Sequence, residues 1–241
     1  MNKGAVHTLV CLPPAGASSA YFRGWQAAAG ERLRIMTPEL PGRQGRFSEP
    51  PLHSISAMAE EVRAALAVLP SEAAFSLFGH SMGALVAYEV TRLLEGAGGR
   101  RPRALLVSAH RPPGWPRRPQ PRFRRPADVA RYFASVNGRP APPELIELML
   151  PTIRADLEAC ANYTHRHQRP LKTPITVYGA MGDMGVPAIM LGGWRSVTAG
   201  GFRQRLFPGD HGYLARHAGA VIDDIVACGE DNRGEQTCST T

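Results

Sequence analysis

A serine stands inside a candidate tight turn at residues 79–83, which read Gly-His-Ser-Met-Gly. A short apolar run, 74–78, precedes the turn, and a stretch with helical periodicity, 84–94, follows it. A strand, this glycine-framed turn and a helix together present a serine hydroxyl on a strained backbone, where a neighbouring base can activate it. The two glycines let the strand and the helix pass close to each other. The pattern therefore predicts that Ser81 is a nucleophile for acyl transfer.

Such a serine needs a histidine as its base. Turns of this kind are typical of α/β-hydrolases, in which the chain order is serine, acid, histidine. His211 follows a predicted strand, 203–207, through a short loop, so it lies at that strand's carboxyl end. His80 sits on the serine's own turn, where we expect its side chain to pack away from the hydroxyl. The other histidines begin a strand, precede the remaining partners or belong to helices: His7, His53, His110, His165, His167 and His217.

The acid that orients the base is predicted to be Asp183. It follows the predicted strand 175–178 through a glycine-flanked turn and precedes His211, as the chain order requires. Taken alone, a Gly-Asp pair is also ordinary turn chemistry. Two other aspartates are weaker candidates, because Asp210 is adjacent to His211 and would have difficulty reaching its Nδ1 atom, and Asp156 falls in a predicted helix of an inserted segment.

Two backbone amides are predicted to form the oxyanion hole. The first is the N–H of Met82, the residue after the nucleophile. The second comes from the loop after the first strand, residues 12–18, where two prolines stiffen the path and small residues leave the amides accessible. Ala15 is the candidate for this second donor.

Short apolar segments alternate with helical patterns along the chain. The expected strands cover residues 7–11, 33–37, 74–78, 104–108, 175–178 and 203–207. The expected helices cover residues 21–29, 55–69 with Ser54 as the N-cap, 82–94 and 213–228. This alternation predicts an α/β fold with a mostly parallel, doubly wound sheet. Right-handed crossovers then bring the carboxyl ends of the strands, and the active site, to one edge.

The alternation breaks between residues 112 and 170, where three helical patterns occur, at 127–136, 143–150 and 152–163. We expect a helical lid inserted over the active edge, with most of its spaced apolar residues packing inward: Leu145, Leu148, Met149, Ile153 and Leu157. The predicted organisation is an α/β-hydrolase core at 1–111 and 171–229, the lid insertion at 112–170, and a flexible tail at 230–241, which is polar and aperiodic.

The composition is that of an ordinary globular protein, with 44% hydrophobic residues, and 241 residues suit one α/β core. A single apolar strand follows Lys3 without a cleavage site, and no apolar run is long enough to span a bilayer. The four cysteines have neither metal nor disulfide spacing, and Cys11 falls in a predicted buried strand, which argues against a nucleophilic role for it. We therefore expect a cytoplasmic protein that binds no membrane.

The net charge is +8, and arginines concentrate between residues 100 and 125. This segment is broken by prolines and holds only Trp115 and Phe123 as aromatic residues, so it lacks the recognition elements of a nucleic-acid-binding surface. We expect no nucleic-acid partner. A solvated loop is the simpler interpretation, and a docking surface for an acidic protein, through Arg117, Arg118 and Arg122, is the alternative.

The chain resembles the type II thioesterases that accompany polyketide synthases and nonribosomal peptide synthetases. The matching segments run nearly end to end: 12–16 (Leu-Pro-Pro-Ala-Gly), 38–43 (Pro-Glu-Leu-Pro-Gly-Arg) with Arg46 and 49–51, 79–84, 107–108, 150–156 (Leu-Pro-Thr-Ile-Arg-Ala-Asp), 174–177 and 207–211 (Phe-Pro-Gly-Asp-His). The family's catalytic triad maps onto Ser81, Asp183 and His211, in agreement with the chain-order argument.

The resemblance implies that the enzyme hydrolyses acyl thioesters on the phosphopantetheine arms of acyl or peptidyl carrier proteins, removing stalled or aberrant groups. It implies a covalent acyl-enzyme on Ser81 and no cofactor beyond the arm that the substrate carries. We also expect a monomer. Three alternatives stay open: a generic carboxylesterase or lipase-like enzyme acting on oxygen esters, an acyltransferase with the same triad, and a non-catalytic carrier-binding protein. The intact triad argues against the last of these.

Overall fold

A computed structural model describes residues 6–116, 126–137, 142–165 and 169–236. Its centre is one sheet of six strands in the order β2-β1-β3-β4-β5-β6, and every neighbouring pair of these strands is parallel. The strands are β1 (Thr8–Leu12), β2 (Arg34–Met36), β3 (Phe75–His80), β4 (Leu105–Ser108), β5 (Ile175–Ala180) and β6 (Phe202–Phe207). The predicted parallel, doubly wound sheet is confirmed.

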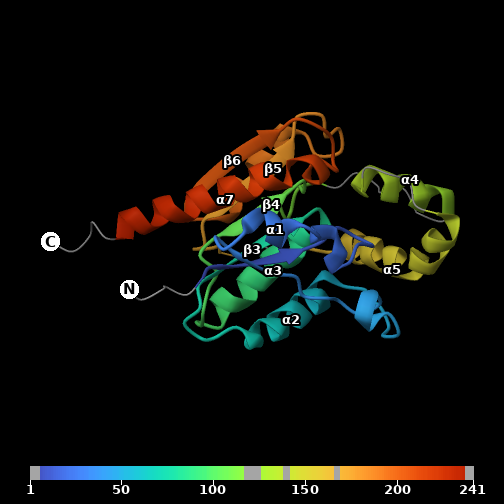
Figure 1. Ribbon diagram of the computed structural model, residues 1–241, viewed down its shortest axis with the longest axis horizontal. Coiled ribbons are helices and arrows are strands. Elements are labelled where there is room, and N and C mark those ends of the chain that lie inside the picture. Colours follow the sequence, from blue (N-terminus) through green and yellow to red (C-terminus); the bar gives the residue numbers. More distant parts are fainter. Residues whose placement is uncertain (1–5, 117–125, 138–141, 166–168, 237–241) are drawn as a thin grey trace.

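Helices cover both faces of the sheet and make a hydrophobic core on each side (Figure 1). On one side, α1 (Trp25–Ala29) packs beside α7 (Leu214–Gln236). On the other side, α2 (Ile55–Ala65) packs beside α3 (Met82–Gly96). The short helix α6 (Ala188–Gly192) lies between β5 and β6 in the chain. Strands β1, β3, β4 and β5 are buried along their whole length, as expected of strands covered on both faces.

Several element boundaries differ from the sequence prediction for local reasons. The expected helix 21–29 divides into a 3₁₀ turn, Ser19–Phe22, and α1, because Gly24 between them has a φ of +89°. The expected helix 55–69 ends as a 3₁₀ turn, Leu66–Val68, while its predicted N-cap is confirmed by the 3.1 Å bond from the Ala57 amide to Ser54 Oγ. Two further 3₁₀ turns cover Gln44–Arg46 and Gly193–Val197.

The described part of the segment between β4 and β5 contains two helices, α4 (Pro126–Asn137) and α5 (Pro143–Asn162), which lie together at one end of the molecule (Figure 1). The sequence predicts a break at Pro151, but α5 is continuous there. A proline in a helix removes one hydrogen bond, and here the buried residues on both sides of it, Ile146 and Ile153, hold the helix together.

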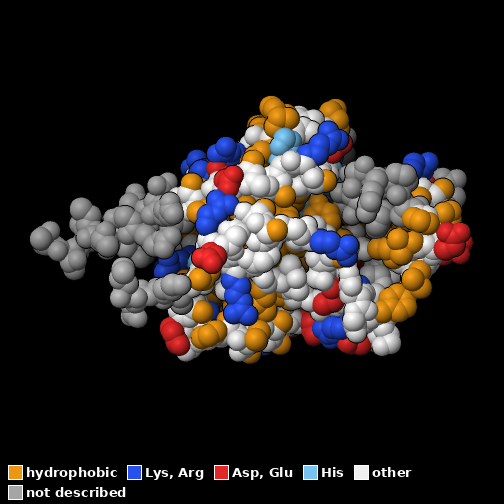
Figure 2. All heavy atoms as spheres, viewed as in Figure 1, with side chains coloured by type: hydrophobic (Ala, Val, Ile, Leu, Met, Phe, Trp, Pro, Cys, Tyr) orange, Lys and Arg blue, Asp and Glu red, His pale blue; other side chains and the backbone are white. Residues whose placement is uncertain are grey.

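Three of the five lid residues expected to pack do so, because Ile153 is fully buried and Met149 and Leu157 are partly buried against the same cluster. Leu145 and Leu148 instead face solvent, at the end of the molecule where Figure 2 shows a band of hydrophobic side chains. On the helical wheel, Leu148 points away from the packed stripe and Leu145 lies at its margin.

Helix α7 continues to Gln236, although the sequence predicts a flexible tail from residue 230. The buried stripe of Val221, Ile222 and Ile225 anchors the helix on the sheet, and an established helix propagates at little cost through polar residues. Residues 237–241 lie outside the described part of the chain. Among the helices that the structure describes, none is both long and apolar enough to cross a membrane.

Candidate active site

Ser81 occupies a strained turn between β3 and α3. Its φ is +53° and its ψ is −118°, and its amide donates a 2.8 Å hydrogen bond to the carbonyl oxygen of Ser108 on β4. A Cβ atom on Gly79 would lie 2.1 Å from the carbonyl oxygen of Gly83, and one on Gly83 would lie 2.2 Å from that of Leu12. Only glycine fits these two close approaches, so the steric role predicted for both glycines is confirmed.

Ser81, His211 and Asp183 come together at the carboxyl edge of the sheet. The Oγ atom of Ser81 lies 3.1 Å from Nε2 of His211, and Nδ1 of His211 lies 2.7 Å from Oδ2 of Asp183. The three residues follow β3, β6 and β5, which meet at this edge only because the sheet is parallel. This geometry is that of a serine, a base and an orienting acid.

Asp183 is held as a carboxylate. Its Oδ1 atom accepts hydrogen bonds from the amides of Gly185 (2.9 Å) and Val186 (3.1 Å), which leaves Oδ2 for the imidazole. Burial raises the pKa of Asp183, but the bond to His211 and these two amides outweigh burial, so the pKa lies below its ordinary value. An ionised Asp183 accepts from Nδ1–H of His211, and Nε2 is then free to accept the proton of Ser81.

His80 packs behind the triad, as expected from its place on the turn. Its Nδ1 atom lies 2.8 Å from Oγ of Ser108, which in turn lies 2.7 Å from the hydroxyl of Tyr213. Burial lowers the pKa of His80 well below its ordinary value, so the ring stays neutral. Its ring centroid is 5.2 Å from that of His211, and a neutral ring at this distance does not oppose the charge that His211 gains in catalysis.

The remaining candidates for base and acid lie elsewhere. The other described histidines make contacts through the pairs His7–Ser76, His53–Glu158, His110–Arg111, Tyr88–His165 and Phe207–His217. His167 and the arginines Arg117, Arg118 and Arg122 lie outside the described residues. Asp210 accepts the amide of Gly212 (3.0 Å), and Asp156 is paired with an arginine, so neither takes the place of Asp183. Cys11 is fully buried, and burial raises the pKa of its thiol.

The loop after β1 lies against the nucleophile turn and forms a β-turn of its own. The amide of Ala17 donates to the carbonyl oxygen of Pro14 (3.1 Å), and Gly16, at the third position, has a φ of +74°. This bond and this φ are typical of a type II turn. In such a turn the hydrogen bond joins the first and fourth residues, so the N–H groups of the second and third residues do not take part in it. Ala15 is the second residue. Its buried position and that of Met82, the first residue of α3, are compatible with two donors for an oxyanion.

Tyr132 is a residue of this site that sequence reasoning missed. It belongs to lid helix α4, and its side chain hydrogen-bonds with that of Ser81. Burial of the hydroxyl group raises the pKa of Tyr132, so it remains protonated. The sequence of a predicted lid helix does not indicate which part of the core its aromatic residue will contact. The contact with Ser81 is therefore visible only once α4 is placed in the structure.

Two adjoining cavities lie between α3, the end of α5 and the segment after β4, and their described lining includes no residue of the triad. The larger, about 360 Å³, has Tyr88, Trp115 and His165 in its wall. The smaller, about 30 Å³, has Leu85 and Cys160 in its wall, and it shares residues 112–115 with the larger one. Leu85 lies one helical turn after Ser81, so a group attached to the serine could extend in this direction.

Comparisons with known proteins agree with this geometry. The family model described as "Thioesterase domain" matches residues 7–228. Thioesterase PikA5 of Streptomyces venezuelae is 34% identical over 90% of this chain and 79% of its own length, and the gramicidin S biosynthesis protein GrsT of Aneurinibacillus migulanus is 31% identical over 89% and 85%. The solved structure of the type II thioesterase BorB from the borrelidin biosynthetic cluster superimposes with a TM-score of 0.85, at 31% identity over 93% of each chain.

The structure of RedJ, a thioesterase from the prodiginine pathway in Streptomyces coelicolor, gives the same result, with a TM-score of 0.85 and 32% identity over 93% of this chain and 86% of that one. The similarity therefore covers the sheet, the lid and the serine turn alike. On this evidence the chain belongs to the thioesterase family, whose members hydrolyse acyl thioesters, and type II thioesterases are among its relatives.

Proposed function

We propose that this enzyme hydrolyses acyl thioesters on the phosphopantetheine arms of acyl or peptidyl carrier proteins, clearing stalled or aberrant groups from polyketide or nonribosomal peptide assembly lines. The observation that carries the proposal is the contact series from Ser81 through His211 to Asp183, at 3.1 and 2.7 Å. The substrate class is supported by relatives named for such pathways, among them GrsT and BorB.

In the first half of the reaction, Nε2 of His211 takes the proton of Ser81 as Oγ attacks the thioester carbonyl carbon. The carbonyl oxygen becomes an oxyanion, for which the amides of Met82 and Ala15 are the proposed donors. Asp183 keeps Nδ1 of His211 protonated and stabilises the imidazolium. The tetrahedral intermediate then collapses, the carbon–sulfur bond breaks, and the pantetheine thiol leaves with the proton from His211.

In the second half, His211 takes a proton from water as the water oxygen attacks the ester on Ser81. Collapse of the second intermediate releases the carboxylic acid and returns the proton to Ser81. A thiolate is a far better leaving group than an amine, so these residues suffice, and we propose that the enzyme uses no cofactor beyond the arm of its substrate. The cavities beside Leu85 and Trp115 would accept the acyl chain.

We also propose that the enzyme acts as a cytoplasmic monomer that binds neither nucleic acid nor membrane, with a carrier domain as its partner. In the view of Figure 2, Lys and Arg side chains are interspersed with Asp and Glu and form no continuous stripe, which favours a protein partner over a nucleic acid on this face. Leu145 and Leu148 of lid helix α5 are exposed apolar surface for such a partner to cover.

A panel of acyl-loaded carrier proteins, with mass spectrometry of the products, tests the proposal. We expect free acids from the native enzyme, and a Ser81→Ala variant should lose activity by about 10⁵-fold or more. A fluorophosphonate should label the native protein at Ser81 only. Matched oxygen esters provide the comparison: hydrolysis of these at rates equal to those of thioesters would indicate a generic esterase, and amides or esters among the products would indicate an acyltransferase.

A further inference from the structure

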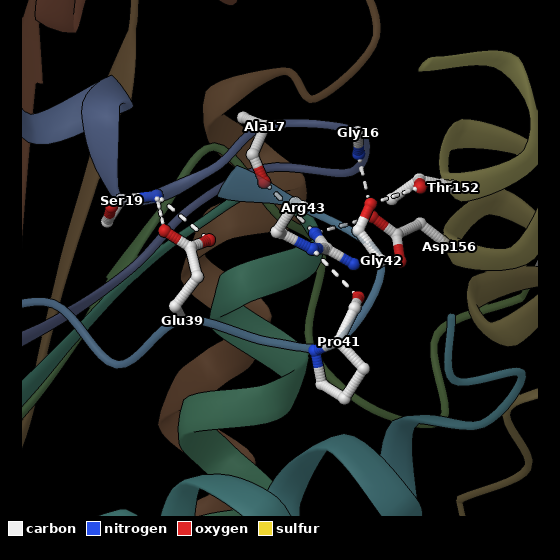
Figure 3. A network of polar contacts seen from close by, with 9 residues as sticks. All are labelled: Gly16, Ala17, Ser19, Glu39, Pro41, Gly42, Arg43, Thr152 and Asp156. Atoms are coloured by element: carbon white, nitrogen blue, oxygen red, sulfur yellow. Dashed lines mark hydrogen bonds and ion pairs between the residues drawn. The ribbon is translucent and has the colours of Figure 1, made fainter. Parts of the chain in front are cut away.

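A buried ion pair joins Asp156 of lid helix α5 to Arg43, in the segment after β2, beside the loop that holds the proposed oxyanion donor (Figure 3). Asp156 is fully buried, and Arg43 is 5% exposed. The guanidinium makes two bonds to the carboxylate, from Nη2 to Oδ1 (2.9 Å) and from Nη1 to Oδ2 (3.0 Å). Such a bidentate pair fixes both partners in orientation as well as distance.

The same carboxylate also accepts a backbone amide of the oxyanion loop. Oδ2 of Asp156 lies 2.7 Å from the amide nitrogen of Gly16, and Nη1 of Arg43 lies 3.0 Å from the carbonyl oxygen of Ala17. Asp156 and Arg43 therefore hold two successive residues of the loop, one by its donor and one by its acceptor. Figure 3 shows the three chain segments converging on this one carboxylate.

The effect on Ala15 follows from the geometry of the turn. In the type II turn of residues 14–17, the bond from Ala17 to Pro14 fixes the peptide that contains the Ala15 N–H, and it points that N–H out of the turn. The neighbouring N–H, of Gly16, is taken up by Asp156. Among the hydrogen bonds described for residues 6–116, none begins at the Ala15 amide, which is left for a ligand.

Helix α5 makes these contacts through one face. Thr152 Oγ1 donates to the carbonyl oxygen of Gly42 (2.7 Å), and a Cβ atom on Gly16 would lie 2.2 Å from Cγ1 of Ile153. Asp156 lies one helical turn beyond Thr152, on the same side. The helix thus presses on the loop at Gly16 and binds it there, with no room for a side chain between them.

We infer that Asp156 is a positioning residue for the oxyanion hole: by accepting the Gly16 amide it sets the turn that aims the Ala15 N–H at the reacting carbonyl, and Arg43 supplies the charge that allows a carboxylate to stand there. The inference rests on the proposed hydrolysis at Ser81. It makes α5 a fixed wall of the active site and gives a lid residue a share in transition-state stabilisation.

The test compares two double variants that both lack the ion pair. In Arg43→Leu/Asp156→Asn the amide oxygen can still accept the Gly16 N–H, and in Arg43→Leu/Asp156→Leu no acceptor remains, while side-chain size is nearly matched. We expect the Leu/Leu variant to have a kcat about 10- to 100-fold below that of the Leu/Asn variant, because complete loss of one oxyanion donor costs about 10²–10³ in kcat. KM should be similar in the two variants.

A trifluoromethyl ketone analogue of the substrate separates a positioning role from a merely structural one. Ser81 adds to its carbonyl carbon, His211 takes the serine proton, and the ketone oxygen becomes an oxyanion. Its inhibition constant should rise from the Leu/Asn to the Leu/Leu variant by the same factor as kcat/KM falls, whereas the dissociation constant of an unreactive thioether analogue should not change. Thr152→Val, which cuts a bond of α5 to a different loop, is the matched control and should keep the native kcat.

Equal kcat and equal ketone inhibition in the two double variants would overturn the inference, whereas an inactive native enzyme would overturn the proposed hydrolysis instead. If the variants do not fold, the native protein still gives an answer by NMR. The amide proton of Gly16, donating 2.7 Å to a buried carboxylate, should resonate far downfield and exchange slowly with solvent. A Gly16 amide that exchanges as fast as an exposed loop amide would also refute the inference.

Discussion

The two lid helices are attached to the core in different ways. Helix α5 is held by a buried ion pair, by the bond from Thr152 to Gly42 and by direct packing of Ile153 on Gly16. Helix α4 instead rests on α5, through the fully buried Val129, and reaches the nucleophile through Tyr132. Helix α5 is thus bonded to the core by polar contacts, whereas α4 lies over Ser81 and is supported mainly by apolar packing.

The difference in attachment suggests different tasks for the two lid helices. Tyr132 of α4 bonds the side chain of the proposed nucleophile Ser81, so we expect α4 to move when an acyl carbonyl approaches the serine. Helix α5 has to stay, because the proposed oxyanion loop depends on its carboxylate. A charge pair buried on α5 and an apolar contact under α4 suit these tasks, since separating a buried ion pair costs far more than sliding one apolar surface over another.

The largest of the expected effects is the loss of stability in the single variant Asp156→Leu, which removes the ion pair that attaches α5 to the core. The change leaves Arg43 buried and unpaired, so the free energy of unfolding should fall by about 3–5 kcal/mol. Val129→Ala is the matched change under α4, and by removing two carbon atoms from a buried contact it should cost only about 1.5 kcal/mol. Urea unfolding followed by circular dichroism measures both. Equal losses in the two variants would mean that the helices are attached with similar strength.

Sequence patterns predicted the part of the site that depends on the sheet. Ser81, Asp183 and His211 each follow a strand, and parallel strands bring their carboxyl ends together whatever covers them. The helical pattern around Asp156 argues against it as the acid, and the structure pairs it with Arg43, but no sequence pattern indicates its contact with Gly16. A contact between residues 140 positions apart depends on how α5 packs, and no local pattern reports it. Tyr132 was missed for the same reason, and the break expected at Pro151 was wrong because packing overrode local propensity.

A smaller effect is expected from Tyr132→Phe, which keeps the ring and removes the hydroxyl. A hydrogen bond of this kind contributes about 1 kcal/mol, so its loss should favour the state in which α4 has moved away from the serine by about fivefold. The rate at which a fluorophosphonate labels Ser81 should rise accordingly, with stability almost unchanged. Tyr163→Phe, at the end of α5, provides the control, since its hydroxyl bonds Glu89 on α3. A slower labelling rate in Tyr132→Phe would instead show that this hydroxyl assists the nucleophile.

The smallest effect is a pH dependence of stability that distinguishes Asp156 from Asp183. Burial raises the pKa of Asp156 above its ordinary value of 3.8, and Arg43 and the Gly16 amide offset this only in part. The folded state therefore binds the Asp156 proton more tightly than the unfolded chain, and stability from this source is lost as the pH rises through the folded pKa. The contribution of Asp183 to stability changes with pH in the opposite direction. Its pKa is lowered in the folded state, so it adds stability that is lost only when the pH falls below 3.8.

Arg43→Leu/Asp156→Asn isolates the contribution of Asp156, because the variant keeps Asp183 but lacks the titrating carboxylate of Asp156. As the pH is lowered from 7 towards 4, the native protein should gain stability relative to this variant, and the Asp183 contribution should cancel in the difference. Parallel urea titrations at several pH values measure it. A difference that shrinks on acidification would mean that the ion pair with Arg43 holds the Asp156 carboxylate more strongly than burial opposes it, and α5 would then be tied to the core by charge more firmly than this comparison of the two helices assumes.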